Sequence, residues 1–185
     1  MKKPLILIAT ALLAACNSTP TTMTAEKDST KMESKDKMRP IQSPYAVRYS
    51  SSFVMDDPKN AETVLALWKA YDNGDLSATR DLIADTFEVN LAEGFSKRAP
   101  RDTVIAMIQA HRNMLAAAVD VVDAVMAVKS TDKNERWALV WGTEKDTHKD
   151  GKVDSVYLQE TWRFNKDGKA DLLYQYAQQT PMKKK

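Results

Sequence analysis

A single glutamate carries most of the chemical interest of this sequence. Glu160 lies in the run 153–164, where apolar and polar residues alternate as in a strand with one buried and one exposed face. Glu160 stands in the apolar series, between Leu158 and Trp162. An isolated buried carboxylate is costly, so a carboxyl group there must be protonated, paired or in contact with water. We expect Glu160 to be either a general acid, base or ligand anchor with a raised pKa, or a glutamate paired with a lysine or arginine at a water-filled end of the domain.

The second candidate for chemistry is His111. It falls on the apolar stripe of a predicted helix, 101–118, together with Val104, Ile108 and Leu115. A histidine at this place is either a core residue with satisfied ring nitrogens or, if it shares a cavity with Glu160, one half of a proton-transfer pair. The other histidine, His148, stands beside a predicted turn, where we expect it to be exposed.

Other common types of active site are not predicted. The chain has two histidines and one cysteine, and no cluster at the spacing of metal ligands. It also has no glycine-rich phosphate loop and no nucleophile elbow. We therefore expect no metal site and no cofactor.

Helices are predicted in the first half of the chain. Asp57 is a good N-cap, Pro58 suits the first helical position, and Gly74 suits the left-handed position that ends a helix. The apolar residues between them have helical spacing: Val64, Leu65, Trp68 and Tyr71. Asp75 then caps a shorter helix with Leu76, Leu82 and Ile83, and alternation at Phe87, Val89 and Leu91 predicts a short strand that ends near Gly94.

Apolar and polar residues alternate throughout the second half of the chain. Four successive strands are predicted at 119–129, 136–147, 152–164 and 169–178, and Asp-Gly pairs at 150–151 and 167–168 mark hairpins. The run 47–55 predicts a weak additional strand or an ordered arm. Helices followed by strands indicate an α+β domain, in which about three helices cover one face of a curved antiparallel sheet. Such a sheet leaves a cone with an open end, where a ligand would bind.

The N-terminal region carries export signals. Residues 1–15 have two lysines and then an apolar stretch too short to span a bilayer, as in a secretory signal peptide. Leu13-Ala14-Ala15-Cys16 resembles the lipobox of bacterial lipoproteins, which implies lipidation of Cys16 and attachment to the membrane. Asn17, by the same resemblance, favours the outer membrane of the cell envelope, with the protein facing the periplasm.

The remaining organisation follows from composition. Residues 16–45 are rich in Thr, Ser, Lys and Glu and predict a disordered tether; 46–180 form the domain, and 181–185 are a basic tail. Removal of 1–15 takes away Lys2 and Lys3, so 27 basic and 25 acidic residues become 25 and 25. A neutral chain without a basic patch predicts no nucleic-acid partner.

The domain resembles the nuclear transport factor 2-like superfamily, in its SnoaL-like branch. The segments that carry the resemblance are 67–76, 82–85 and 162–169, within about 60–177. The resemblance implies the cone-shaped fold, and it implies little about function, because this fold hosts isomerases, cyclases, dehydratases and binding proteins. Family members often dimerise through the sheet, and Trp137, Leu139 and Trp141 would form an apolar patch there if their phase faces outward.

The resemblance also bears on the site. Glu160 occupies the place of the protonated acid of ketosteroid isomerase, but Leu67 replaces its tyrosine, and Asn90 or Leu91 replaces its catalytic base. None of these replacements can act as a general base, so steroid isomerase activity is not supported. The predicted ligand pocket consists of Trp68, Tyr71, Asn90, Leu158, Trp162 and Gln175. We expect a non-catalytic domain that binds a small, largely apolar ligand or a protein partner; the alternative is an isomerase or dehydratase that uses Glu160 with His111.

Overall fold

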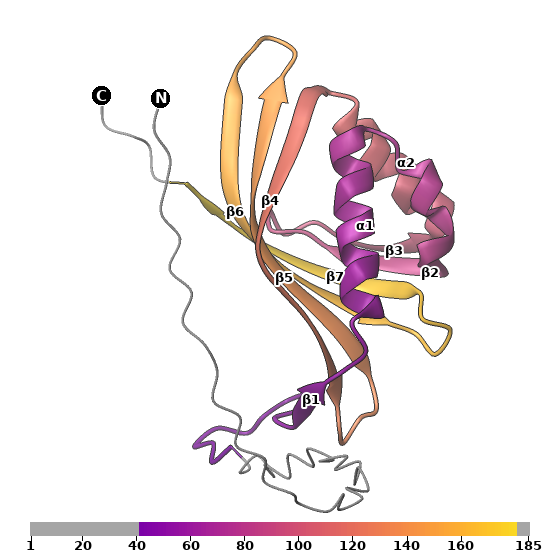
Figure 1. Ribbon diagram of the computed structural model, residues 1–185, viewed down its shortest axis with the longest axis vertical. Helices are drawn as coiled ribbons and strands as arrows, with labels where there is room; N and C mark the ends of the chain where they lie inside the picture. The colour runs from indigo at the N-terminus through magenta and orange to yellow at the C-terminus, as the bar shows by residue number, and fades with distance from the viewer. Residues whose placement is uncertain (1–40, 181–185) are drawn as a thin grey trace, which may run out of the picture. The chain divides into compact units, whose positions relative to one another are not determined.

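The computed structural model describes residues 41–180 of the chain (Figure 1). The predicted signal peptide, the lipidation of Cys16, the tether up to residue 40 and the tail 181–185 therefore lie outside the described residues. The elements are, in order, β1 (Phe53–Met55), α1 (Lys59–Asn73), the 3-10 helix η1 (Ser77–Leu82), β2 (Ile83–Asn90), β3 (Ser96–Pro100), α2 (Arg101–Arg112), β4 (Leu115–Ser130), β5 (Arg136–His148), β6 (Val153–Phe164) and β7 (Ala170–Gln179). Among the described residues, no helix combines the length and the hydropathy needed to cross a bilayer.

The first helix begins and ends where its capping residues predict. The Asp57 carboxylate accepts a 3.0 Å hydrogen bond from the Lys59 backbone N–H, which has no partner inside the helix. Gly74 ends α1 with a positive φ of 79°, and its N–H bonds the Tyr71 carbonyl at 2.9 Å. Asp75 likewise accepts the Ser77 N–H at 2.9 Å, at the start of η1.

Seven strands form one curved sheet in the order β1-β4-β5-β6-β7-β2-β3. The predicted meander of four antiparallel strands, β4 to β7, is confirmed, and Gly151 and Gly168 adopt the positive φ values of 85° and 73° at its two Asp-Gly turns. The sheet is antiparallel except at one place, where β2 pairs with β7 in parallel. Figure 1 shows α1 and α2 on the same side of this sheet, which agrees with the predicted α+β cone.

The structure corrects the predicted end of the third helix. The helix predicted at 101–118 ends at Arg112, and Leu115 already belongs to β4. The segment 115–119, Leu-Ala-Ala-Ala-Val, has good helix propensity, but pairing with β5 from Leu115 opposite His148 overrides it. Leu115 is therefore a strand residue, and it does not share a helical stripe with His111.

The ends of the sheet differ in detail from the expectation. The run 47–55, expected as a weak strand or an ordered arm, forms a strand at Phe53–Met55, which pairs with the end of β4. The strand β3 was not predicted, because Lys97, Arg98 and their neighbours show no apolar alternation. Its pairing with β2 follows from a tight turn, in which the Leu91 N–H bonds the Phe95 carbonyl at 2.8 Å and Gly94 has a positive φ.

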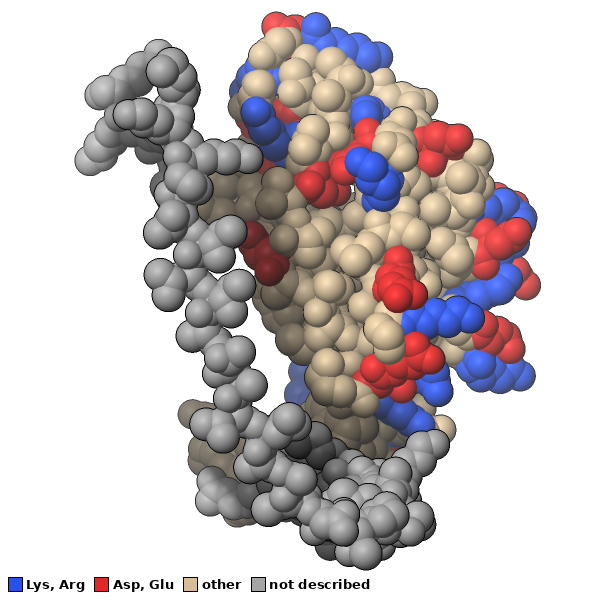
Figure 2. All heavy atoms as spheres, viewed as in Figure 1, with Lys and Arg blue, Asp and Glu red and all other residues tan. Residues whose placement is uncertain are grey.

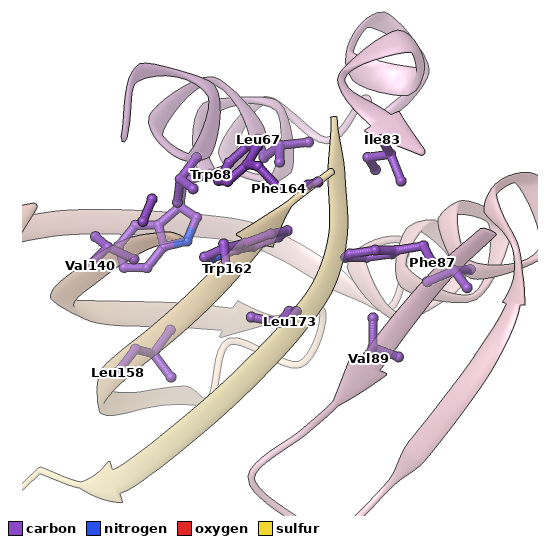
Figure 3. Close-up of a cluster of buried hydrophobic side chains, with 14 residues drawn as sticks. Leu67, Trp68, Ile83, Phe87, Val89, Val140, Leu158, Trp162, Phe164 and Leu173 are labelled. Atoms are coloured by element: carbon purple, nitrogen blue, oxygen red, sulfur yellow. The ribbon is translucent and has the colours of Figure 1, made fainter. Parts of the chain in front are cut away.

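The core lies between α1 and the inner face of the sheet (Figure 3). Phe87 and Trp162 stack with their ring centroids 5.9 Å apart at an interplanar angle of 14°. The other labelled side chains of Figure 3 surround this pair: Leu67, Trp68, Ile83, Val89, Val140, Leu158, Phe164 and Leu173. On the face shown in Figure 2, acidic and basic side chains are mixed and do not separate by sign.

Candidate functional site

Glu160 is buried, with 4% of its surface exposed, and three donors meet its carboxylate. The indole nitrogens of Trp68 and Trp162 donate to Oε2 at 2.6 and 2.9 Å. The side-chain amide of Gln175 donates to Oε1 at 2.9 Å. The donors come from α1, β6 and β7, and Gln175 is the direct partner of Glu160 across the β6–β7 ladder. Three elements of the fold therefore converge on one carboxylate.

The environment of Glu160 sets its protonation. Burial raises the pKa of Glu160, while the hydrogen bonds from Gln175, Trp68 and Trp162 act against this shift. The net direction of the pKa is upward. Because Oε2 accepts two N–H groups and Oε1 accepts one, a proton on this carboxyl group would sit on Oε1. The three donors satisfy the carboxylate form of Glu160 without a counter-ion.

The space beside Glu160 is filled by side chains. The Trp68 indole lies directly on Gly142 of β5, where an added Cβ would come within 2.9 Å of the ring and 2.5 Å of the Val121 carbonyl oxygen. Glycine at this position is what lets the indole reach the sheet and donate to Glu160. Neither of the two hollows described below is lined by Glu160 or its donors.

A second group of polar residues lies where the C-terminal ends of α1 and α2 meet. The Tyr71 hydroxyl and the His111 Nδ1 are 3.0 Å apart. The Arg112 guanidinium, which is buried, donates to the Tyr71 and Asp72 carbonyls at 2.7 and 3.0 Å, and it lies 5.9 Å from the centre of the Tyr71 ring. These bonds satisfy carbonyl groups that the end of α1 leaves without partners.

Carboxyl groups face this end of α1 from the sheet. Asp120 of β4 stands opposite Glu144 of β5, and the Asp120 N–H donates to the Asp72 carboxylate at 3.0 Å. Burial, followed by the neighbouring carboxylates, raises the pKa of Asp120 to about 7 and that of Glu144 to about 8. Burial also raises the pKa of Asp146. Among residues 41–180, no group of three or more His, Cys, Asp or Glu side chains is placed to hold a metal ion.

An apolar hollow, here called the outer hollow, lies on the opposite face of the sheet. It has a volume of about 290 Å³ and its exposed surface is apolar throughout. The lining residues come from the segment before α1 and from β4, β5 and β6: Tyr49, Phe53, Met126, Val128, Trp137, Leu139 and Thr161. Tyr49 covers Trp137 edge to face, with ring centroids 5.6 Å apart, and accepts a 3.2 Å hydrogen bond from its indole nitrogen.

A smaller hollow of about 210 Å³ lies at the start of α2. Its charged residues already pair with one another, because Arg80 donates to both carboxylate oxygens of Asp102 at 2.7 and 2.9 Å and Arg101 lies 3.3 Å from Asp85. This hollow offers no free charge to a ligand.

The structure brings some of the predicted pocket residues together and separates others. Trp68, Trp162 and Gln175 contact Glu160, and Leu158 lies in the same core. The remaining predicted residues have other partners: Tyr71 bonds His111, and Asn90 bonds Ser96 at 2.7 Å. Glu160 and His111 thus belong to two separate hydrogen-bonded groups.

Sequence reasoning missed Asp120 and Glu144. A usable signal was present for Glu144, because it continues the buried phase of Ala138, Val140 and Gly142 along β5. For Asp120 the signal was hidden by a register shift in β4 between Val122 and Ala124, which breaks simple alternation. The sequence left open whether Trp137, Leu139 and Trp141 face outward; in the structure Trp137 and Leu139 line the outer hollow.

No protein-family model and no curated protein matches the sequence. Solved structures do match the fold. A nuclear transport factor 2-like protein of unknown function from Burkholderia pseudomallei aligns with a TM-score of 0.51 and 22% identity over 64% of this chain and 89% of its own.

Two further structures give the same result at lower identity. SalBIII, an epoxide hydrolase/cyclase-like enzyme of pyran ring formation in salinomycin, aligns with a TM-score of 0.55 and 10% identity over 68% of this chain and 95% of its own. AusH from Aspergillus nidulans aligns with a TM-score of 0.54 and 12% identity over 68% of this chain and 87% of its own. At these identities the likeness concerns the fold. The described domain therefore has the cone-shaped nuclear transport factor 2-like fold.

Proposed function

We propose that this chain is a lipid-anchored protein of the bacterial envelope whose domain binds a small, largely apolar molecule without transforming it. The observation that supports this proposal most directly is the outer hollow, which has a volume of about 290 Å³ and an apolar exposed surface. Small-molecule sites are concave and mostly apolar, at roughly 300 Å³ and above. The hollow is at the lower limit of that range, so it suits a small ligand or part of a larger one.

The anchor is the second part of the proposal. Lipidated Cys16 would hold the protein at the outer membrane, facing the periplasm, and residues 16–45 would form the tether. Mass spectrometry of the protein purified from bacterial membranes tests this directly. A diacylglyceryl-modified Cys16 at the N-terminus is expected, and an intact N-terminus or cleavage elsewhere would contradict it.

The surroundings of Glu160 favour binding over catalysis. A general acid or base must reach the substrate atom within hydrogen-bonding distance. The Glu160 carboxylate already has three protein donors, and Trp68 and Trp162 pack over it. Its simplest role is to hold α1, β6 and β7 together in the core.

Binding of an uncharged fluorescent dye, N-phenyl-1-naphthylamine, tests the ligand site. We expect saturable binding with a blue-shifted emission, weakened about tenfold or more in Leu139→Asn, because an amide would be buried in an apolar site at a cost of about 1–3 kcal/mol. Val121→Asn is the matched control, since Val121 is 57% exposed and does not line the hollow. If the dye does not bind saturably, or if both variants bind it equally, the outer hollow is not the ligand site.

The second candidate function is an isomerase or dehydratase that uses Glu160 with His111 for proton transfer. What favours acid–base chemistry is the pair Asp120 and Glu144, whose pKa values of about 7 and 8 suit proton transfer near neutral pH. Exchange of α-protons of small ketones in D₂O, followed by NMR, tests it. Exchange that is faster with the wild-type protein than with Glu160→Gln would support the enzyme; no acceleration would exclude it for these substrates.

We further propose that the sheet forms a homodimer. Its outer face exposes large side chains on neighbouring strands, with 57% of Val121, 45% of Tyr157 and 59% of Tyr176 accessible. Sedimentation of the wild type and of Tyr176→Lys tests this proposal. A dimer that dissociates in the variant is expected, and a wild-type monomer at all concentrations would contradict it.

A further inference from the structure

The segment that leads into the domain exposes apolar side chains beside the outer hollow. This arm, residues 41–55, includes residues that would be expected in a core but are largely accessible: Ile41 at 69%, Tyr45 at 81%, Val47 at 48% and Met55 at 72%. Large side chains exposed in one contiguous segment mark a surface that contacts another apolar phase. The arm and the outer hollow are continuous, because Tyr49 and Phe53 belong to both.

The arm is fixed to the sheet by polar contacts at its middle. Tyr49 donates its hydroxyl proton to the Glu135 carboxylate, Ser50 donates to Asp132 at 2.6 Å, and the hydroxyls of Ser52 and Thr131 are 2.5 Å apart. Backbone pairing of β1 with β4 completes the attachment. Tyr49 and Phe53 are therefore held in a defined place at the hollow, and Met55 follows them in β1, paired with Val128.

The register of the strands gives the hollow its shape. Its floor is built from pairs that lie side by side across three strands: Val128 faces Trp137, Met126 faces Leu139, and Leu139 faces Thr161. Since strands are about 4.8 Å apart, the floor runs roughly 10 Å across the sheet and only two residues along it. The row continues from Thr161 to its partner Tyr174, which is 37% exposed. An apolar floor of this width can accept the end of an aliphatic chain.

The proposed lipid anchor would place the domain near the acyl chains of a membrane. Cys16 precedes Ile41 by 25 residues, and a flexible chain of that length has a root-mean-square reach of ~25–30 Å. The arm is the first described part of the chain after this proposed tether, so it would lie within that reach of the bilayer surface. An acyl-chain ligand rests on the proposed function, because the lipid anchor is part of that proposal.

We infer that the arm and the outer hollow form a lipid-binding face, which takes one acyl chain of a membrane phospholipid. The hollow is too small for a whole phospholipid, so the headgroup and the second chain remain in the bilayer. Tyr45, Val47 and Met55 contact the acyl region next to the bound chain.

Quenching of Trp137 by brominated lipid tests this inference. The full-length chain is mixed with phosphatidylcholine vesicles in which one acyl chain carries bromine, and with the same vesicles without bromine. The variant Trp141→Phe serves as the background, because it leaves Trp137 as the indole that lines the hollow. We expect quenching by the brominated vesicles that falls at least fivefold when Trp137→Phe is added, and that also falls in Val47→Ser, an exposed substitution that leaves the lining intact.

Three results would overturn the inference. If the naphthylamine dye binds at the hollow but brominated lipid does not quench Trp137, the ligand is not an acyl chain, while the proposed function stands. If neither the dye nor the brominated lipid binds, both the proposed function and the acyl-chain inference are wrong. If quenching is the same with and without Trp137, the face is not a lipid site.

Discussion

The indole nitrogen of Trp68 donates a 2.6 Å hydrogen bond to Oε2 of Glu160, a residue 92 positions later in the chain. This bond ties α1 to the centre of the sheet. The carboxylate it satisfies is buried and has no cationic partner among its three donors. Stability of the domain should therefore depend on the indole N–H as well as on the size of the ring.

Trp68→Phe is expected to lower the free energy of unfolding by about 1–3 kcal/mol, because it leaves a buried acceptor one donor short and opens a small cavity. It should also raise the pKa of Glu160, since one of the bonds that oppose the upward shift is lost. Urea denaturation and NMR of the Glu160 carboxyl carbon measure the two effects. Trp141→Phe, on the opposite face of the sheet, is the matched control; equal losses in both variants would contradict the role of the indole N–H.

Gly142→Ala is expected to displace the Trp68 indole, because the new methyl group would approach the ring to 2.9 Å and the Val121 carbonyl to 2.5 Å. Overpacking of a filled core costs about 1–3 kcal/mol. Denaturation and the near-ultraviolet circular dichroism of the tryptophans measure the change. Thr143→Ala, the next residue of β5 on the other face, should alter neither, and a fully stable Gly142→Ala would mean that the ring and β5 can separate freely.

Stability should fall as the pH rises from about 4 to about 8. The folded pKa values of Asp120 and Glu144, about 7 and about 8, lie above the values of ~4 expected in the unfolded chain. Between these limits the folded state holds protons that the unfolded state has released, so raising the pH favours unfolding. Thermal denaturation between pH 5 and pH 9 measures this slope.

Glu144→Gln is the matched variant for the pH experiment. Its amide cannot ionise, so the dependence of the melting temperature on pH should become shallower, with the largest gain over the wild type above pH 8, by about 2–4 °C for each kcal/mol gained. Glu93→Gln, at an exposed carboxyl in the turn before β3, should keep the wild-type slope. If the melting temperature of Glu144→Gln depends on pH as strongly as that of the wild type, other titratable groups determine the pH dependence.

Tyr49→Ala is expected to uncover Trp137 without unfolding the domain. The ring of Tyr49 lies edge to face on Trp137, which is only 8% exposed, and holds the arm through Glu135. We expect a red shift of tryptophan emission and faster hydrogen exchange in the arm, with a stability loss of about 1 kcal/mol for the lost aromatic pair. Tyr45→Ala, at the 81% exposed neighbour, is the control and should leave the emission unchanged.

The sequence predicted the architecture well where one physical signal dominated. Capping residues located α1, and Asp-Gly turns located the hairpins of the meander. Prediction failed where distant pairing overrides local preference: the alanines after Arg112 favour a helix in isolation, yet they extend β4 because β5 offers a long partner. The strand β3 was not predicted for a related reason. It forms by pairing with β2, and its own side chains show no strand pattern.

The candidate site was predicted only in part for a similar reason. The unusual position of Glu160 was readable from alternation along β6, and its burial agrees with that pattern. Its partners were not readable as partners, because a tryptophan spaced for a helical core gives no sign that its N–H points at a carboxylate. The covering of Trp137 by Tyr49 joins residues 88 positions apart, and the sequence carries no local trace of that contact.

The parallel pairing of Ile83 with Ala170 and of Val89 with Leu173 joins an early strand to the last one. The core residues of the early strand, Ile83, Phe87 and Val89, have no sheet neighbour on that side until the C-terminal strand has been synthesised. The sheet therefore cannot be completed until the last strand has been synthesised, and a chain that lacked β7 would leave this flank of the core uncovered.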